Sequence, residues 1–249
     1  MRDAFALPNR SHWAIAFKSA LSTLAYRGVE LMRALSPYLF AAIFIVLSPA
    51  ARAATTPGEQ FVQQSLDKGY AILNDTSLSA GERGDKFRAL LASIMDSKRV
   101  AVFTLGIYAR TAGDYDLDQY TNAFSEFVTA VLQHDLAGSP GESVTVTGSI
   151  ARTPDDAIVA AKLTGSTRVN GQPINLGFRV RTSPTGAYEL VDLVVEGVSM
   201  AVAQRSDFTS WLQQHHGDVA ALTRELQARA QEFREQDMTA QAPRTALAK

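Results

Sequence analysis

The sequence predicts an α+β fold: a curved four-stranded antiparallel meander with helices packed on one face. Apolar residues recur with helical spacing over residues 58–132, alternate with period two over 144–195, and return to helical spacing up to residue 233. Blocks of helices and strands favour segregated layers over alternating βαβ units. Because the chain has no cysteine, disulfides and cysteine-ligated metals are excluded.

Residues 1–53 are interpreted as an N-terminal extension and a cleaved secretory signal peptide. The unbroken apolar run Leu39–Leu47 is too short to cross a bilayer, which takes about 20 residues. Basic residues precede it, and the small-x-small motif Ala51-Arg52-Ala53 follows, so we expect export and cleavage after Ala53. A retained membrane anchor is the alternative. Translation starts at Met1 or at Met32, which begins a complete signal peptide by itself.

Residues 54–234 are expected to form one folded domain, and 235–249 a disordered tail. From Ala54 onward the chain has 18 Lys and Arg against 23 Asp and Glu, a net charge of −5. This mild acidity provides no basic footprint for nucleic acid and argues against constitutive binding to anionic membranes.

Three helices are expected first. One covers Gly58–Leu73, and Ser79 forms a capping box with Glu82 at the start of the second. The third apolar segment, Val100–Tyr108, contains Gly106, which costs about 1 kcal/mol relative to alanine inside a helix. That glycine suggests that another element approaches closely.

A fourth helix is expected before the strands, and two more after them. The fourth begins at Asp116 or Asp118. After the strands, Ser206 or Asp207 caps a short helix and Asp218 caps the last one. The apolar stripe of the fourth helix is Leu117, Tyr120, Phe124, Phe127, Val128 and Val131.

Four strands are predicted between these helices. Val144–Ile150 alternates apolar and polar residues, and Ile158–Val169 is the returning strand. Asn170-Gly171 tolerates the positive φ angles of a tight hairpin turn. Ile174–Val180 and Tyr188–Val195 complete the meander.

No catalytic or metal motif is recognisable. The histidines His134, His215 and His216 lack the H-E-x-x-H or H-x-H spacing of zinc sites, and no nucleophile elbow, P-loop or dinucleotide fingerprint occurs. Asp192 and Glu196 share one side of a strand, and a glycosidase pair needs carboxyl groups about 5–9 Å apart. Structural hydrogen bonding is the better interpretation, because no aromatic subsite accompanies them.

Two segments resemble the MlaC (toluene-tolerance auxiliary) family. Asp96–Arg110 contains an aspartate, an apolar run and a Leu-Gly-x-Tyr sequence. Val191–Met200, followed by Arg205–Phe208, is similar to the second signature of that family. The order of the elements from about Gly58 to Leu226 also fits, so the resemblance covers nearly the whole mature chain.

The resemblance implies a non-enzymatic periplasmic carrier with a deep apolar lipid pocket between helices and sheet. Such proteins hold a glycerophospholipid and pass it between an outer-membrane lipoprotein–porin complex and an inner-membrane ABC transporter with an MCE-domain ring. This maintains the lipid asymmetry of the outer membrane. The resemblance implies no cofactor, metal or nucleotide, with phospholipid as cargo.

The same resemblance implies a set of site residues. Glu196, Ser199 and Arg205 are expected to shape the pocket mouth or to dock a partner. The expected lipid-binding residues are Leu105, Tyr108, Phe124, Phe127, Val131, Leu176, Phe178, Leu193, Val195, Val198 and Met200.

Other functions stay open at this point. Ala109, Val131 and Leu132 depart from aromatic positions of the family, so another lipid such as a hopanoid is an alternative cargo. A small-pocket enzyme would use a buried Asp192 or Tyr108 with a shifted pKa. A scaffold protein with a filled core is the third possibility, since protein interiors normally close-pack.

Overall fold

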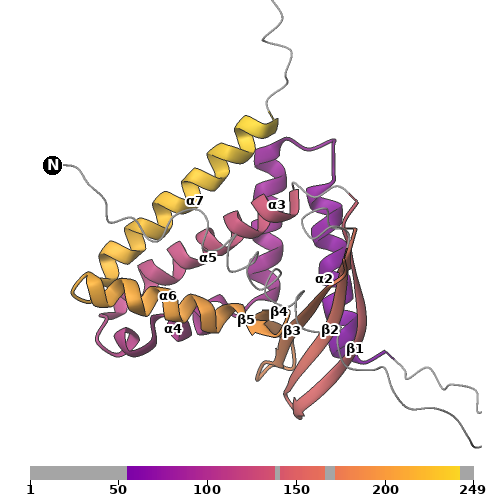
Figure 1. Cartoon of the computed structure of the whole chain (residues 1–249), viewed down its shortest axis with the longest axis horizontal. Helices are drawn as coiled ribbons and strands as arrows, with labels where there is room; N and C mark the ends of the chain where they lie inside the picture. Colours follow the sequence, from indigo (N-terminus) through magenta and orange to yellow (C-terminus); the bar gives the residue numbers. More distant parts are fainter. Residues whose placement is uncertain (1–54, 138–140, 166–171, 242–249) are drawn as a thin grey trace, which may run out of the picture.

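The computed structural model describes residues 55–137, 141–165 and 172–241 (Figure 1). Within these ranges four α-helices precede five strands and two α-helices follow, which confirms the α+β class. The elements are α2 (Pro57–Leu73), α3 (Ala80–Ile94), α4 (Ser97–Leu105), the 3-10 turn η1 (Gly106–Arg110), α5 (Asp114–Ala137), β1 (Ser143–Thr153), β2 (Asp156–Thr164), β3 (Ile174–Thr182), β4 (Tyr188–Val195), β5 (Val198–Ser199), α6 (Met200–Gln214) and α7 (Val219–Gln241). The expected signal peptide with its cleavage site, the Asn170-Gly171 turn and residues 242–249 lie outside the described residues.

Capping boxes define the starts of the first two helices. Ser79 Oγ accepts a hydrogen bond from the backbone N–H of Glu82 at 3.3 Å, and the Ser79 N–H donates to Glu82 Oε2 at 2.8 Å. Thr56 and Glu59 form the same reciprocal pair at the start of α2. Each box satisfies two amides that a helix start leaves without partners. The predicted box at Ser79 is confirmed.

The third apolar segment forms an α-helix that begins and ends three residues earlier than predicted, at Ser97–Leu105. It ends at Leu105, because Gly106 adopts a φ of +59° and the chain continues as η1. A Cβ atom at Gly106 would lie 2.9 Å from Cγ2 of Thr209 on α6. Glycine thus permits both the positive φ and the close approach of α6. The close approach that the sequence suggested is confirmed.

The strands lie in chain order, each antiparallel to its neighbour. Val159 of β2 is opposite Phe178 of β3, which is opposite Leu193 of β4. Directly opposite side chains in antiparallel pairs project from the same face. These residues therefore define one apolar face of the sheet, which we call the inner face.

The sheet has a fifth strand where the sequence predicted four. Val198 of β5 pairs with Val195 of β4, and a strand of two residues is too short to show an alternating pattern. Farther along β4, Met95 bridges Leu190, and the Asp96 N–H donates to the Leu190 carbonyl at 3.2 Å. The α3–α4 link and β5 thus cover parts of an edge that would otherwise expose unpaired backbone groups.

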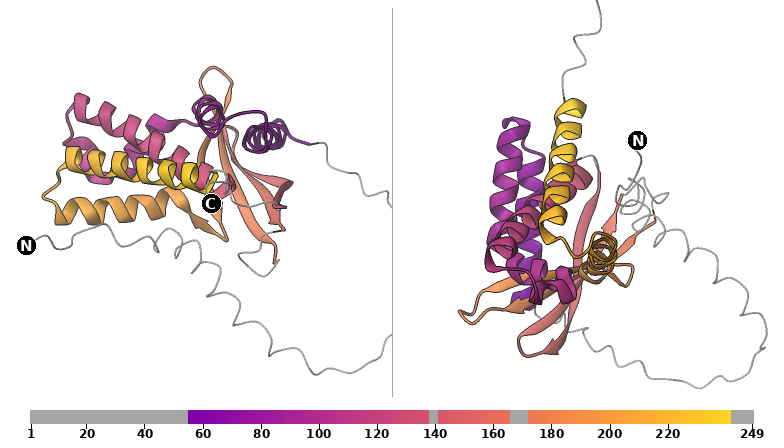
Figure 2. Two further views of the ribbon diagram at one scale, coloured as in Figure 1. Left: turned by 90° about the horizontal axis from the view of Figure 1, so that it is seen from above. Right: turned by 90° about the vertical axis from the view of Figure 1, so that its left-hand side faces the viewer.

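The helices form two groups around the sheet (Figure 2). In the first group, α2 packs on the inner face, where Val62 contacts the cluster of Val159 and Val180. In the second group, α4, α5, α6 and α7 pack on one another beside β4, and α5 runs along α7. Only part of the helical layer therefore lies directly on the sheet.

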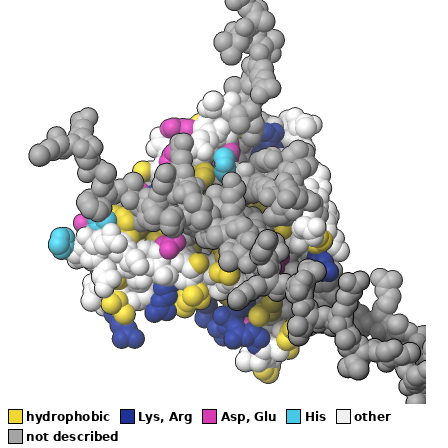
Figure 3. Space-filling model, in the orientation of Figure 1, with side chains coloured by type: hydrophobic (Ala, Val, Ile, Leu, Met, Phe, Trp, Pro, Cys, Tyr) yellow, Lys and Arg dark blue, Asp and Glu magenta, His cyan; other side chains and the backbone are white. Residues whose placement is uncertain are grey.

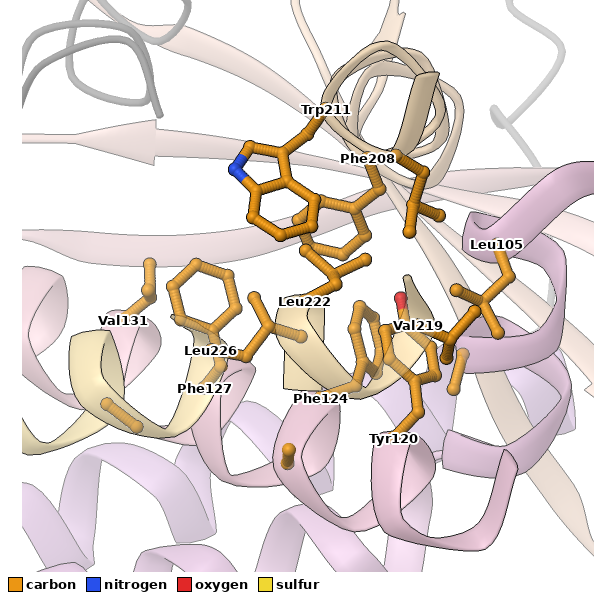
Figure 4. Packing of buried hydrophobic residues seen from close by; sticks show 14 of the residues in the cluster. Leu105, Tyr120, Phe124, Phe127, Val131, Phe208, Trp211, Val219, Leu222 and Leu226 are labelled. Atoms are coloured by element: carbon orange, nitrogen blue, oxygen red, sulfur yellow. The ribbon is translucent and has the colours of Figure 1, made fainter. Parts of the chain in front are cut away.

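The largest apolar core lies among the helices. Phe124 and Phe127 of α5 point toward Leu222 and Leu226 of α7, with Phe208 of α6 beside them (Figure 4). We call this set the helical cluster. Its members are Ala101, Leu105, Tyr120, Ala123, Phe124, Phe127, Ala130, Val131, Phe208, Trp211, Leu212, Val219, Leu222, Leu226 and Ala230.

Two helix starts differ from the sequence prediction. The fourth helix begins at Asp114, so Asp114 and Asp116 both fall in the first turn, where carboxylates interact favourably with the helix dipole. The helix after the strands begins at Met200, well before Ser206. Its cap is Ser199, whose Oγ accepts from the Val202 N–H at 3.1 Å.

The last helix is longer than predicted. The disordered tail was expected from residue 235 onward, but the chain is still helical there. Helix α7 continues to Gln241. His134 Nδ1 of α5 lies 2.7 Å from Asp237 Oδ1, and Thr239 Oγ1 donates to the Glu235 carbonyl at 2.8 Å. Polar contacts of this kind extend a helix without producing an apolar stripe, which is why the pattern did not reveal it.

Candidate functional site

The inner face of the sheet is the candidate site. Leu176 is opposite Val195, and Phe178 is opposite Leu193, so the four expected sheet residues do share one face. They contribute to two apolar clusters at different ends of that face. The strand alternation in the sequence therefore predicted their orientation correctly.

One end of the inner face is covered by α2. Val62 packs with Val159 and Val180, and the Phe61 ring stacks on Tyr188 with centroids 5.9 Å apart. We call the buried residues Val62, Val159 and Val180 the α2-covered cluster. Phe178 packs against it.

The other end forms what we call the corner cluster. Its buried members are Leu163, Ile174 and Val195, and partly exposed members pack around them: Val144, Leu176, Leu193 and Met200. Partly exposed apolar side chains on the inside of a sheet provide a surface that an apolar molecule can cover, gaining about 0.8 kcal/mol for each buried methylene. The arrangement thus suits binding by burial, without a reactive group.

The helical residues of the expected lining belong elsewhere. Leu105, Phe124, Phe127 and Val131 are buried in the helical cluster, and Tyr108 packs against that cluster (Figure 4). The expected lining is therefore distributed over three apolar clusters, and Val198 is exposed on β5. The assignment of these residues to a lipid stays a prediction.

The three residues expected at the mouth have separate local roles. Glu196, with a φ of +48°, turns the chain between β4 and β5, and its Oε1 accepts from the Asn175 N–H at 2.5 Å. Ser199 caps α6. Arg205 lies with its guanidinium carbon 5.0 Å from the centroid of the Phe103 ring. Of the three residues, only Arg205 directs its charged group toward an element outside the corner between β4 and α6.

Asp192, the candidate acid of the enzyme alternative, is engaged by the backbone and side chains around it. Its Oδ2 accepts from Ser199 Oγ at 2.5 Å, and its Oδ1 accepts from the Ala201 N–H at 3.0 Å. Both carboxylate oxygens therefore hold the start of α6 against β4. This is the structural hydrogen bonding that the sequence interpretation favoured for the residue.

The sequence interpretation missed a buried amide on α6. Gln204 is 4% exposed, and its Oε1 has no hydrogen-bond partner in the described structure. It lies four residues after Met200 of the corner cluster and four before Phe208 of the helical cluster, so one face of α6 carries all three. That spacing is the signal that could have identified Gln204 as an interior polar group between the two clusters.

The opposite, outer face of the sheet carries the ion pair of Arg179 with Asp156. Arg179 donates from Nε to Asp156 Oδ1 at 3.0 Å and from Nη2 to Oδ2 at 2.5 Å. The hydrogen bonds from Arg179 hold the pKa of the Asp156 carboxyl below its ordinary value. On α2, which covers one end of the inner face, the pKa of the Tyr70 phenol is raised mainly by burial and to a smaller extent by the negative charge of Glu142. The inner face is thus the apolar side of the sheet.

The described residues provide neither a metal-binding cluster nor a membrane-spanning helix. Across residues 55–137, 141–165 and 172–241, His, Asp and Glu form no group of three placed to hold a metal ion. Over the same ranges, no helix combines the length and apolar character needed to cross a membrane.

Comparisons with known proteins agree on the family and the fold. The family model described as MlaC protein matches residues 63–228. No curated protein gives a significant match. Among the solved structures, the chain is similar to a phospholipid-binding protein from Ralstonia solanacearum in complex with a phospholipid, with a TM-score of 0.59 and 21% identity over 72% of this chain and 99% of that one. Because the family model spans more than half of its residues, the chain belongs to the MlaC family.

Proposed function

We propose that the chain is a non-enzymatic periplasmic carrier that holds a glycerophospholipid by its acyl chains. It shuttles the lipid between an outer-membrane lipoprotein–porin complex and an inner-membrane MCE/ABC transporter, and so maintains outer-membrane lipid asymmetry. The observation that carries this proposal is the family match over residues 63–228. The fold shared with a protein solved in complex with a phospholipid supports it.

The physics of lipid transfer supports the same function. Each methylene moved out of an apolar environment costs about 0.8 kcal/mol, so a two-chain lipid needs an apolar replacement for the bilayer. The partly exposed side chains of the corner cluster, Leu176, Leu193 and Met200 among them, offer such a surface. A hopanoid would use the same surface. Chemical identification of the lipid that copurifies with the protein distinguishes the two cargoes.

Residues 1–53 are proposed to direct the export that this function requires. The apolar run Leu39–Leu47 and the motif Ala51-Arg52-Ala53 support cleavage after Ala53. N-terminal sequencing of the secreted protein is expected to begin at Ala54. A mature protein that keeps Leu39–Leu47 would instead indicate a membrane anchor.

A pair of substitutions on β4 tests the candidate site. Leu193 lies on the inner face, and its neighbour Val194 lies on the outer face. Leu193→Gln is expected to lower the phospholipid recovered per protein severalfold, because it places an amide among the acyl chains. Val194→Gln makes a similar change one residue away and is expected to leave the lipid content unchanged.

The readout is phospholipid phosphorus after organic extraction of protein purified without detergent. Circular dichroism first establishes that both variants keep the α+β fold. Equal lipid content in Leu193→Gln and Val194→Gln would remove the corner cluster from the site.

A further inference from the structure

Two helices outside the sheet carry an exposed apolar patch. Phe103 of α4 is 38% exposed, Ile107 of η1 is 67% exposed, and Val202 of α6 is 57% exposed. These are three of the seven large hydrophobic side chains that are exposed in the described part of the chain. Scattered exposed apolar residues are ordinary, whereas several gathered on one surface indicate an interaction site.

The packing of α4 on α6 brings these side chains together. Gly106 lets α6 approach, and a Cβ at this position would lie 3.1 Å from Nε of Arg205. Phe103 and Ile107 are four residues apart on α4 and η1, and Val202 is three residues before Arg205 on α6. The spacing of three places Val202 and Arg205 on the same side of α6, and Phe103 and Ile107 lie on either side of Gly106 in the sequence, where the chain meets α6. Because α6 packs against both α4 and η1, we treat these four side chains as one surface and call them the seam.

Arg205 lies in this seam with its positive charge unpaired. Its guanidinium carbon is 5.0 Å from the Phe103 ring centroid. It forms no ion pair in the part of the chain that the structure describes, whereas the nearby Lys98 and Arg99 are paired with Asp118 and Asp96. A guanidinium held over an aromatic ring is already oriented for a carboxylate.

Figure 3 shows hydrophobic and basic side chains along the lower edge of the view, below the helices α4 and α6 of Figure 1. We propose that Phe103, Ile107, Val202 and Arg205 form a docking surface for a protein partner that presents apolar side chains around a carboxylate. This proposal concerns the outside of the molecule and is independent of the cargo. It therefore stands even where the proposed lipid carriage fails.

Charge favours a protein over a lipid surface as the occupant. Binding to anionic membranes uses clusters of about 4–8 Lys or Arg. Among the described residues, only Arg110 and Arg205 of the basic side chains on α4, η1 and α6 form no ion pair, and the chain from Ala54 onward carries a net charge of −5, with 18 Lys and Arg against 23 Asp and Glu. A single oriented arginine beside apolar side chains instead matches the anchors found at the centres of protein interfaces.

Photocrosslinking in the native cell tests the surface. A photoreactive phenylalanine analogue replaces Ile107 in the full chain, and the matched control replaces Ile150, which is 71% exposed on β1. We expect a protein adduct at residue 107 in excess of that at 150, with the linked peptide bearing Asp or Glu. Arg205→Glu should abolish the adduct, and changing the partner carboxylate to Arg should restore it.

Equal adducts at residues 107 and 150 would overturn the proposal, as would an adduct insensitive to Arg205→Glu. Cosedimentation with phosphatidylglycerol vesicles provides the other arm. Vesicle binding that Ile107→Ser and Arg205→Glu both remove, while Ile150→Ser does not, would replace the protein partner with a membrane surface. An unchanged thermal midpoint in each variant shows that the fold is intact.

Discussion

The carboxylate of Asp192 and the hydroxyl of Ser199 form a hydrogen bond of 2.5 Å across the corner between β4 and α6. Ser199 Oγ also accepts from the Val202 N–H at 3.1 Å, and Asp192 accepts from the Ala201 N–H at 3.0 Å. Strand, two-residue β5 and helix are thereby connected through one polar network. This network explains why an acidic residue and a serine accompany the apolar strand in the sequence.

Neutralising Asp192 is expected to destabilise this corner. Asp192→Asn keeps the shape but turns one acceptor into a donor that faces the Ser199 hydroxyl or the Ala201 N–H, at a cost of about 1–3 kcal/mol in the free energy of unfolding. Urea denaturation measures it. Glu189→Gln on the same strand removes the same charge and is expected to change stability little. Unchanged stability of Asp192→Asn would contradict the structural role.

The buried pair of Thr104 and Tyr120 predicts an asymmetry between two substitutions. Thr104 Oγ1 donates to the Ala101 carbonyl at 2.8 Å, so the Tyr120 hydroxyl, also 2.8 Å from it, must be the donor of their shared bond. Thr104→Val leaves the Tyr120 hydroxyl buried without an acceptor and should cost about 1–3 kcal/mol. Tyr120→Phe removes that donor and should cost about 1 kcal/mol.

The double variant of Thr104 and Tyr120 completes this test. Once Tyr120 is phenylalanine, Thr104→Val no longer strands a donor, so it should add less than it does alone. Strictly additive losses in urea denaturation would contradict the hydrogen bond between the two side chains.

Gln204 predicts a gain of stability on removal of a polar group. Its Oε1 is buried without a partner, and Gln204→Met keeps the volume while removing the amide. We expect the lipid-free protein to be stabilised by up to about 2 kcal/mol, since a buried unpaired polar group carries a desolvation penalty. Gln213→Met, on the exposed side of α6, is the control. A loss of stability specific to Gln204→Met would show that the amide has a partner.

The ion pair of Asp156 with Arg179 predicts a dependence of stability on pH. The pKa of Asp156 lies below its ordinary value of 3.8 in the folded protein, chiefly because Arg179 donates hydrogen bonds to it. A carboxyl that is more acidic when folded adds stability above the ordinary pKa, and this stability is lost as the pH falls through the lower folded value. Asp156→Asn should therefore flatten the fall in the free energy of unfolding below about pH 4.

The neighbouring Asp155 provides the control for that measurement. It lies exposed in the turn between β1 and β2, next to Asp156 at the start of β2, and Asp155→Asn is expected to keep the slope of the original protein. Urea midpoints measured from pH 6 down to pH 2 give both slopes. Equal slopes for Asp156→Asn and the original protein would contradict the link to Arg179.

Local signals in the sequence were reliable where one short segment contains the whole mechanism. Ser79 and Glu82 cap each other within four residues, and the alternation of Leu176 and Phe178 requires only their own strand. Ile150 shows the limit. It was expected on the side of Val146, but a register shift in β1 between Val146 and Gly148 changes the alternation, and Ile150 is exposed.

The candidate site was harder to predict than the fold. Helical spacing identified Phe124 and Phe127 as buried, but periodicity does not say which element covers a helix face. They pack against α7 residues such as Leu222, whereas the corner cluster around Val195 is separate. Contacts between segments far apart in the chain decide this division, and a single sequence does not display them.

Native mass spectrometry of the exported chain, purified from bacterial periplasm without detergent, tests lipid carriage most directly. We predict a folded protein whose mass exceeds that of the polypeptide by a stoichiometric glycerophospholipid, which organic extraction then identifies by its head group. A hopanoid in its place would keep the carrier role but contradict the proposed cargo. A well-folded protein at the mass of the bare polypeptide would contradict lipid carriage itself.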